Sequence, residues 1–322
     1  MTLTLSEKTQ ETLQLLSDSV WIFSAFTIMA ESGGFAALKN RIEIPDLAKI
    51  TAIPSGILEQ MLKIFHKTGF VIQHGPSYEL SSDFFAVIET QGMDKIIAQQ
   101  QVTFGKINDL ILTARAKRMQ VGWQFEDDII LQAQGQLSEL VATDFIPPGS
   151  DVQKALMAPE AIFLDVGAGV AKITLKLCEI YPQLRCVALE PANKPHQLAQ
   201  KNITHSSYSN RIELRKIGVE ALQDIHLFDV VWIAQGFIPA KALIAGLPAV
   251  KKAMKKGAIL LTYAIANDKE NLANCVKNFS ASLYGEVRTV IDMTKILQDA
   301  GFAEVKIISD VIPGYKVMTA VK

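Results

Sequence analysis

The chain has 322 residues, 49% of them hydrophobic and 20% charged, which is an ordinary globular balance with enough length for two domains. The formal net charge of -1 leaves no global basic field that could hold nucleic acid. Cys178, Cys186 and Cys275 are too few and too irregularly spaced for a disulfide framework or a zinc site. We therefore expect a reducing, cytoplasmic environment.

The most apolar early stretch covers residues 12–30. Within it, Leu13, Leu16 and Val20 recur at helical spacing. Polar residues such as Asp18 interrupt the stretch and no positive excess precedes it, so we expect neither a membrane span nor a signal peptide. The pattern predicts a buried helix. Two environments remain open for it: the interior of its own domain, or a contact with a second subunit.

The chain divides into two differently patterned halves. Helical patterning comes first, and from about residue 161 short apolar strands alternate with amphipathic helices, as in a parallel sheet covered by helices. The Pro- and Gly-containing stretch 146–150 is a natural boundary. We predict a helical and winged-helix domain over 1–90, a helical connector over 91–150 and an α/β domain over 151–322.

The winged-helix prediction rests on the order of signals between residues 44 and 80. A short helix at 45–50 and a turn precede a second helix, with Ser55 as its N-cap and Gly69 just past its end. A hairpin turning at 74–77 follows. Asp and Glu slightly outnumber Lys and Arg in this module, whereas DNA affinity depends on basic side chains that neutralise phosphates. A DNA-binding regulator is therefore kept only as an alternative.

The strongest chemical signal is the sequence Leu-Asp-Val-Gly-Ala-Gly at 164–169. An apolar strand enters a turn in which Gly167 permits the tight bend and Gly169 lets a ligand approach the backbone. A helix follows, and its N-terminus offers free N–H groups and positive potential. In a doubly wound sheet, this turn lies at the carboxyl end of the first strand, where ligands bind.

Three residues indicate which ligand this turn binds. Lys172 stands where the dinucleotide fingerprint needs a small residue, which disfavours an NAD(P) oxidoreductase. Asp165, at the end of the strand, suits a cationic ligand better than a pyrophosphate. Glu190, at the end of the next strand, can accept hydrogen bonds from both hydroxyls of a ribose. Together they indicate S-adenosylmethionine.

Further strands are predicted at 211–216, 228–233 and 257–263, and a final pair at 303–309 and 315–321. The second half resembles the class I S-adenosylmethionine-dependent methyltransferase fold, a Rossmann-like seven-stranded sheet that ends in an antiparallel hairpin. The whole chain resembles the winged-helix small-molecule methyltransferases, similar to plant-type O-methyltransferases and their bacterial relatives of secondary metabolism. The segments that carry the resemblance are 122–138, 164–169, 188–191, 228–239 and 254–261.

The resemblance implies a transferase that methylates a small, aromatic or apolar metabolite as a homodimer, with neither nucleic acid nor a membrane as partner. It assigns the cofactor to four groups of residues. They are Asp165, Gly167, Ala168 and Gly169 at the methionine moiety, Glu190 and Pro191 at the ribose and adenine, Gly218, Val219 and Glu220 at the adenine, and Ala234 and Gln235 at the methyl-transfer site. The expected substrate pocket comprises Trp123, Phe125, Gln134, Ser138 and Phe237.

The sequence departs from this family at two positions. Gly218 stands where relatives often place an Asp that accepts from the adenine amino group, and Ile238 stands where plant-type enzymes carry the catalytic His. The usual general base is therefore missing, and only Gln235 and Tyr263 are weak candidates for a catalytic role. A protein that binds S-adenosylmethionine without transferring methyl is the alternative. No metal is expected, because the pair Asp127 and Asp128 lacks a third ligand.

Overall fold

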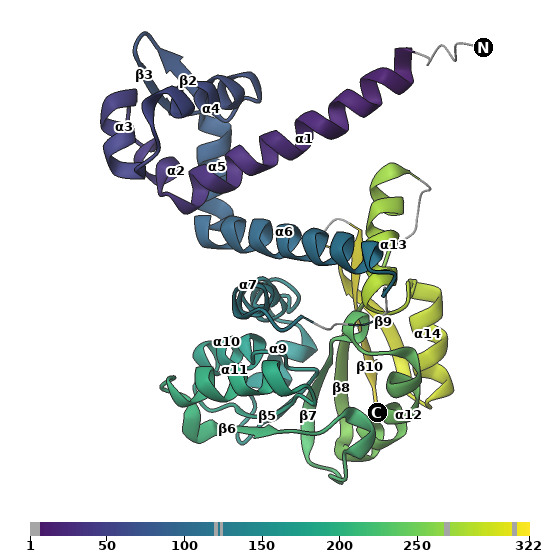
Figure 1. Cartoon of the computed structure of the whole chain (residues 1–322). Helices are drawn as coiled ribbons and strands as arrows, with labels where there is room; N and C mark the ends of the chain where they lie inside the picture. The colour runs from purple at the N-terminus through teal and green to yellow at the C-terminus, as the bar shows by residue number, and fades with distance from the viewer. Residues whose placement is uncertain (1–6, 119–121, 123–124, 267–270, 311–313) are drawn as a thin grey trace, which may run out of the picture. The chain divides into compact units, whose positions relative to one another are not determined.

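The computed structural model describes residues 7–118, 122, 125–266, 271–310 and 314–322. The chain forms two compact units, Met1–Phe104 and Gly105–Lys322, and the boundary falls inside helix α6 (Figure 1). The elements up to and including that helix are α1 (Glu7–Glu31), α2 (Gly34–Ala37), β1 (Ile42–Glu43), α3 (Ile44–Thr51), α4 (Ser55–Lys67), β2 (Val71–His74), β3 (Ser77–Leu80), α5 (Ser82–Gln91) and α6 (Met93–Arg115).

The first unit contains the predicted winged helix. Helices α3 and α4 lie between β1 and the hairpin β2–β3 along the chain, and the three strands form an antiparallel sheet in the order β1-β3-β2. Gly69 ends α4 with a positive φ of 80°, as its predicted position requires. The predicted N-cap was wrong by one residue: Pro54 occupies that position, because its extended backbone lets its carbonyl oxygen accept from Ile57 and Leu58, and Ser55 is the first helical residue.

The core of this unit is a cluster of aromatic rings. Phe35 and Phe65 are fully buried, and Phe26, Phe70 and Phe84 surround them with ring centroids 4.7 to 6.2 Å apart. Tilted and edge-on contacts of this kind add to the free energy gained from the buried area. The aromatic residues thus join α1, α2, α4 and α5 into one core.

One of the two environments predicted for helix α1, the interior of its own domain, is wrong for most of the helix. Its C-terminal end is buried at Met29, but the side chains of Leu16 and Trp21 are 62% and 72% exposed. Most of its apolar surface is therefore not buried in its own domain. Lys8–Glu31 is also the one described stretch long and apolar enough to cross a membrane, which is weak evidence because helices of soluble proteins pass the same test.

The second unit, Gly105–Lys322, has the α/β architecture predicted for the second half of the chain. Its elements after α6 are α7 (Asp128–Ser138), α8 (Leu140–Thr143), α9 (Asp151–Met157), β4 (Ile162–Val166), α10 (Lys172–Ile180), β5 (Arg185–Leu189), α11 (Asn193–Thr204), η1 (Ser209–Arg211), β6 (Ile212–Arg215), η2 (Val219–Ala221), β7 (Phe228–Ile233), η3 (Gln235–Phe237), α12 (Ala240–Ala253), β8 (Met254–Ile265), α13 (Leu272–Tyr284), α14 (Val290–Asp299), β9 (Ala303–Ser309) and β10 (Tyr315–Val321).

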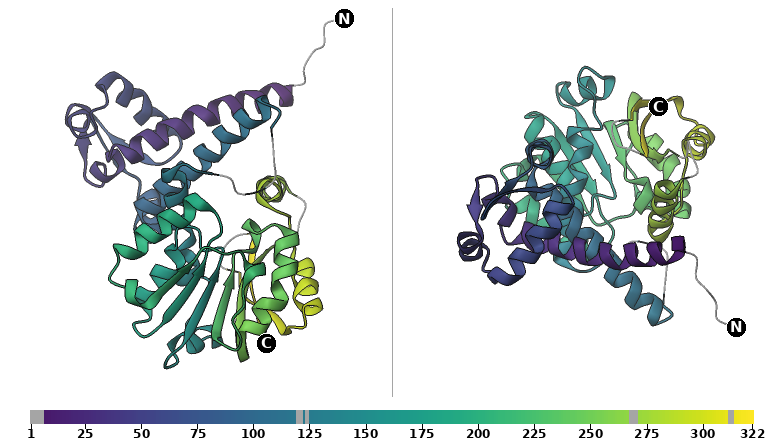
Figure 2. Two further views of the ribbon diagram at one scale, coloured as in Figure 1. Left: turned by 60° about the horizontal axis from the view of Figure 1, so that its bottom comes forward. Right: turned by 90° about the horizontal axis from the view of Figure 1, so that it is seen from above.

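The seven strands lie in the order β6-β5-β4-β7-β8-β10-β9. Strands β4 to β8 are parallel, and β10 runs antiparallel to both β8 and β9, so the chain ends in the predicted hairpin. Helices cover both faces of the sheet (Figure 2). The strand order reverses beside β4, so the carboxyl ends of β4, β5 and β7 lie at the edge where doubly wound sheets generally bind ligands.

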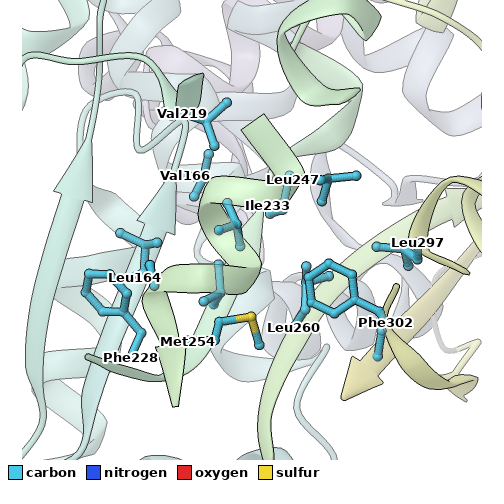
Figure 3. Close-up of a cluster of buried hydrophobic side chains, with 14 of the residues drawn as sticks. Leu164, Val166, Val219, Phe228, Ile233, Leu247, Met254, Leu260, Leu297 and Phe302 are labelled. Carbon is cyan, nitrogen blue, oxygen red and sulfur yellow. The ribbon is translucent and has the colours of Figure 1, made fainter. Parts of the chain in front are cut away.

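Alternate residues of the strands pack on the two faces. On one face, Leu164, Ile233 and Leu260 pack with Leu247 of α12 and Leu297 of α14 (Figure 3). On the other, strand residues that include Trp232 pack against α8, α9 and α10. Burying large apolar side chains contributes about 1.5–3 kcal/mol each, so the two layers hold the strand ends in fixed positions.

Close packing of α12 on η2 gives a test of this arrangement. A Cβ at Gly246 would lie 2.5 Å from a methyl group of buried Val219, so we expect Gly246→Ala to lower the free energy of unfolding by about 1–3 kcal/mol. Gly56→Ala is the matched control, because it meets open space in α4 and should stabilise by up to about 1 kcal/mol. Chemical denaturation measures both changes, and equal effects would contradict the packing described.

Candidate functional site

The site starts at the turn between β4 and α10. The backbone N–H groups of Gly167 and Ala168 both donate to the Leu189 carbonyl, at 3.1 and 2.9 Å, which ties the turn to the end of β5. Gly167 and Gly169 have φ values of 80° and 57°, and the space where a side chain at Gly169 would stand is open. Ala171 adopts the same left-handed region at the start of α10. The turn therefore presents bare backbone beside a helix N-terminus, as a ligand cradle does.

Glu190 closes the turn from the end of β5. Its two carboxylate oxygens accept hydrogen bonds from the backbone N–H groups of Gly169 and Ala192, each at 2.8 Å. Burial raises the pKa of this carboxyl, and the two N–H donors oppose the rise. Each oxygen keeps a second lone pair, so the carboxylate can still accept from ligand hydroxyls. The adjoining Pro191 is exposed.

Asp165 lies behind the turn rather than on its surface. Its side chain is fully buried, and one carboxylate oxygen accepts from the Thr174 hydroxyl at 2.7 Å, whereas the other has no hydrogen-bond partner among the described atoms. The pKa of Asp165 is raised to about 7: burial is the main cause, the hydrogen bond from Thr174 opposes the rise, and the nearby Glu190 adds to it. Asp165 was predicted to border the ligand directly. Because it is buried behind the turn, it acts on a ligand there through its charge.

The loop after β6 supplies the next group of predicted residues. Gly218 precedes η2, Val219 is buried against α12, and the Glu220 carboxylate occupies the space that a side chain at position 218 would fill. Glu220 itself is exposed. A carboxylate therefore lies beside position 218 although the residue there is glycine, because the short helix turns Glu220 back over it.

The carboxyl end of β7 leads into η3, where Ala234 and Gln235 are both buried. Tyr263, near the end of β8, stacks on Trp232 with centroids 6.0 Å apart, and its hydroxyl hydrogen-bonds to the backbone of Gly236. Burial raises the pKa of Tyr263 well above its usual range. Tyr263 is therefore held as a neutral phenol that already has a partner, which makes it a poor base.

The described residues of the predicted substrate pocket lie in two places, one at α7 near the glycine turn and the other in η3. Gln134 and Ser138 lie on α7, and Phe125 packs on a cluster that contains Val170 of the glycine turn. Phe237 is half-buried in η3. Trp123 lies outside the described residues. Gly135 is what brings α7 close to the turn, since a Cβ there would lie 2.9 Å from the Lys172 side chain.

The acidic pair before α7 has the structural role expected of a helix start. The Asp127 carboxylate caps the helix by accepting from the N–H groups of Ile129 and Ile130, and Asp128 pairs with Lys194 at 2.5 Å. Across the part of the chain that the structure describes, no group of three or more His, Cys, Asp or Glu could hold a metal ion.

Sequence reasoning missed two buried cations. Lys106 of α6 donates to the Gln134 side chain at 3.0 Å, and burial lowers its pKa to about 8. Arg288, just before α14, is 2% exposed and donates to the Gln235 carbonyl and side chain at 2.6 and 2.8 Å. No motif or periodicity marks either residue, because contacts between distant segments define their environments.

The structure is similar to solved methyltransferases over nearly its whole length. The S-adenosylmethionine-dependent methyltransferase SibL matches with a TM-score of 0.70 and 16% identity, covering 97% of this chain and 98% of its own. An O-methyltransferase family protein from Burkholderia thailandensis gives 0.71 and 15%, covering 99% of each chain. Human N-acetylserotonin methyltransferase, solved with S-adenosylmethionine, gives 0.69 and 14%, covering 100% and 99%.

At the level of sequence, no family profile and no curated protein matches the chain. The TM-scores of 0.69 to 0.71 establish the fold, and at identities of 14 to 16% the similarity concerns the fold alone. The chain has the class I methyltransferase fold preceded by a winged helix, as predicted.

The buried carboxyl group of Asp165 makes stability depend on pH. Its folded-state pKa of about 7 lies above the ordinary value, so the native state binds more protons and the free energy of unfolding falls as pH rises toward 7. Asp165→Asn removes this loss. We expect the stability of the variant relative to the parent to grow by about 2–3 kcal/mol between pH 5 and pH 8 in denaturant titrations.

Thr174→Val is the companion variant for this titration. It removes the hydroxyl that stabilises the ionised form, so the loss should extend to higher pH than in the parent. A stability difference between Asp165→Asn and the parent that is flat from pH 5 to pH 8 would contradict the placement of this carboxyl.

Proposed function

We propose that the chain is a cytoplasmic S-adenosylmethionine-dependent methyltransferase that acts on a small aromatic or apolar metabolite. The observation that carries this proposal is the Glu190 carboxylate bound to the Gly169 N–H, at the crevice where β4 and β5 end. Solved neighbours of the same fold bear the names of S-adenosylmethionine-dependent methyltransferases, and some were crystallised with that cofactor or its product.

The residues fit this cofactor in shape and charge. The open space over Gly169 accommodates a ligand against the backbone, and Glu190 keeps lone pairs for ribose hydroxyls. We assign to Glu220, whose carboxylate lies beside position 218, the role of accepting from the adenine amino group in place of the Asp of relatives. Asp165 and Glu190 add two buried acids, neither of which has an ion-pair partner in the described residues. A ligand with a sulfonium and an ammonium group supplies the positive charge that this end of the site lacks.

When bound, S-adenosylmethionine supplies an activated methyl group whose bond to sulfur breaks as a bond to the acceptor forms, with the electron pair passing to sulfur. The protein's part is to hold the acceptor in line and exclude water, which can contribute on the order of 7–11 kcal/mol. Ile238, at the position of the usual His, is buried and apolar, and no imidazole lies there. The reaction thus proceeds without the roughly 10²–10⁴-fold contribution of a general base.

The same observation favours one second candidate, a protein that retains the cofactor or its product without transferring methyl. Both candidates use the same cofactor site, and the observation that favours the second is Ile238 at the carboxyl end of β7, where plant-type enzymes carry a base.

Ligand binding tests the cofactor site. S-adenosylhomocysteine at about 100 times its dissociation constant should raise the free energy of unfolding by roughly 2.7 kcal/mol, whereas NAD should not. Glu190→Ala should weaken binding at least tenfold, because it removes the acceptor for the ribose and loosens the turn. Glu179→Ala, an exposed acid on α10, is the control and should bind normally. Thermal shift and calorimetry measure these effects, and NAD-selective stabilisation would refute the assignment.

Methyl transfer itself is tested with methyl-labelled cofactor and a panel of phenols, amines and β-dicarbonyls. We expect label in at least one acceptor of the panel. Cofactor binding with no label in any acceptor would support the binding protein over the enzyme.

We further propose that residues 1–90 form a dimerisation and substrate-cap domain and that the protein is a homodimer, with 91–150 as connector and 151–322 as cofactor domain. The support is α1, whose apolar side chains are exposed over several turns, at Leu13, Leu16, Val20 and Trp21. An exposed apolar patch of this kind is typical of an interaction surface.

Sedimentation tests this interface. Leu16→Asp combined with Trp21→Asp should convert the dimer to monomer, because two charges cannot be buried in an apolar contact without a large desolvation cost. Gln10→Asp, on the same helix, is the control and should remain dimeric. A parent protein that sediments as a monomer at micromolar concentration would contradict the proposal.

A further inference from the structure

A buried cation lies beside the end of β7 without a carboxylate in close contact. The guanidinium of Arg288 donates to the carbonyl and side-chain oxygens of Gln235 and, at 3.3 Å, to the Ile238 carbonyl. Its Nε has no partner among the described atoms. The nearest carboxylate, that of Glu286, is 4.0 Å away and 65% exposed, so solvent weakens its attraction.

Arg288 also determines how the Gln235 amide is oriented. A guanidinium only donates, so the oxygen of the amide must face it and the NH₂ group must point the other way. Gln235 is 1% exposed, and among the described residues the hydrogen bond of its side chain is the one that its oxygen accepts from Arg288. The end of β7 therefore presents an N–H donor backed by a full positive charge.

The surroundings do not neutralise this charge. Tyr263 on β8 is the other titratable group that acts on Arg288 among the described residues, and Tyr315 on β10 packs against Tyr263. Burial raises the pKa of both phenols, which keeps them uncharged. Burial also lowers the pKa of Arg288 itself. A buried charge that has only a distant, exposed carboxylate to oppose it costs several kcal/mol, and such groups cluster at functional sites, where a ligand can complete them.

The position of the charge places it at the acceptor end of the site. Gly285 approaches η3 so closely that a Cβ there would lie 3.1 Å from the Gly236 carbonyl oxygen, which brings Arg288 against the turn after β7. That turn is where relatives carry the base that this chain lacks. The two buried acids, Asp165 and Glu190, lie at the glycine turn, and the buried cation lies at the end of β7.

We propose that Arg288, acting through Gln235, selects acceptors that bind as oxyanions: phenols and enols whose hydroxyl proton has already passed to water. The inference rests on the proposed methyl-transfer function and names its substrate class. Arg288 is a positioning residue: its charge favours the ionised acceptor, and the Gln235 N–H group donates to the acceptor oxygen. A bound oxyanion is itself the nucleophile, so no proton remains for a base to remove, and an amine gains nothing from the charge.

Nitrophenol as a spectroscopic probe tests this without turnover. The absorbance of 4-nitrophenol reports its ionisation when it is bound to the protein saturated with S-adenosylhomocysteine. We expect the pKa of the bound probe to fall by at least about one unit relative to water, which corresponds to a roughly tenfold preference for phenolate. Arg288→Lys should retain most of this shift, and Arg288→Met should lose it.

Gln235→Glu is the sharper variant, because it keeps the size of the side chain and places a carboxylate on Arg288, which preserves the local contacts while cancelling the charge. It should fold at least as stably as the parent and lose the shift. This variant separates an electrostatic role from a merely structural one, which would leave the bound probe's pKa unchanged.

Calorimetry with S-adenosylhomocysteine on the same samples separates the two proposals. If the parent protein does not bind S-adenosylhomocysteine, the proposed function fails. If it binds, but 4-nitrophenol does not bind or binds with its solution pKa, the inference about Arg288 is overturned while the proposed function stands. A shift that persists in Gln235→Glu and Arg288→Met also overturns it.

Discussion

The candidate site depends on one hydrogen-bonded contact, the Glu190 carboxylate between the N–H groups of Gly169 and Ala192. It joins the turn after β4 to the end of β5. The ends of these two paired strands therefore form one candidate ligand surface. A charge-assisted bond of this kind is stronger than a neutral one and holds the open backbone at Gly169 in place.

The two ends of the candidate site differ in charge. Asp165 and Glu190 make the β4–β5 end acidic, although burial favours their neutral forms, and Arg288 places a cation at the β7 end, with the sheet order bringing all three to one edge. Each buried charge is unfavourable alone, because the interior solvates it poorly. A cationic cofactor and an anionic acceptor would complete the two ends together. This arrangement offers a physical reason why a methyl-transfer site can lack a histidine base at Ile238.

Much of the fold could be predicted because its signals are local. The strand and helix periods, the glycine turn at 167–169 and the C-terminal hairpin over 303–321 each depend on residues close together in sequence, and all were found. The N-cap at Ser55 was wrong because a preceding proline competed for the same position. The burial of α1 was wrong in its own domain because an apolar face does not specify what it packs against.

The sequence by itself determined the fold class and the candidate cofactor-binding edge. Both follow from local signals, namely the alternation of strands and helices and the acids at the ends of β4 and β5. Only the tertiary structure decided that Asp165 faces inward, that Glu220 folds over Gly218, and that Arg288 reaches Gln235 across more than fifty positions. Those contacts join segments far apart in sequence, and burial and unpaired charge arise only when such segments pack together.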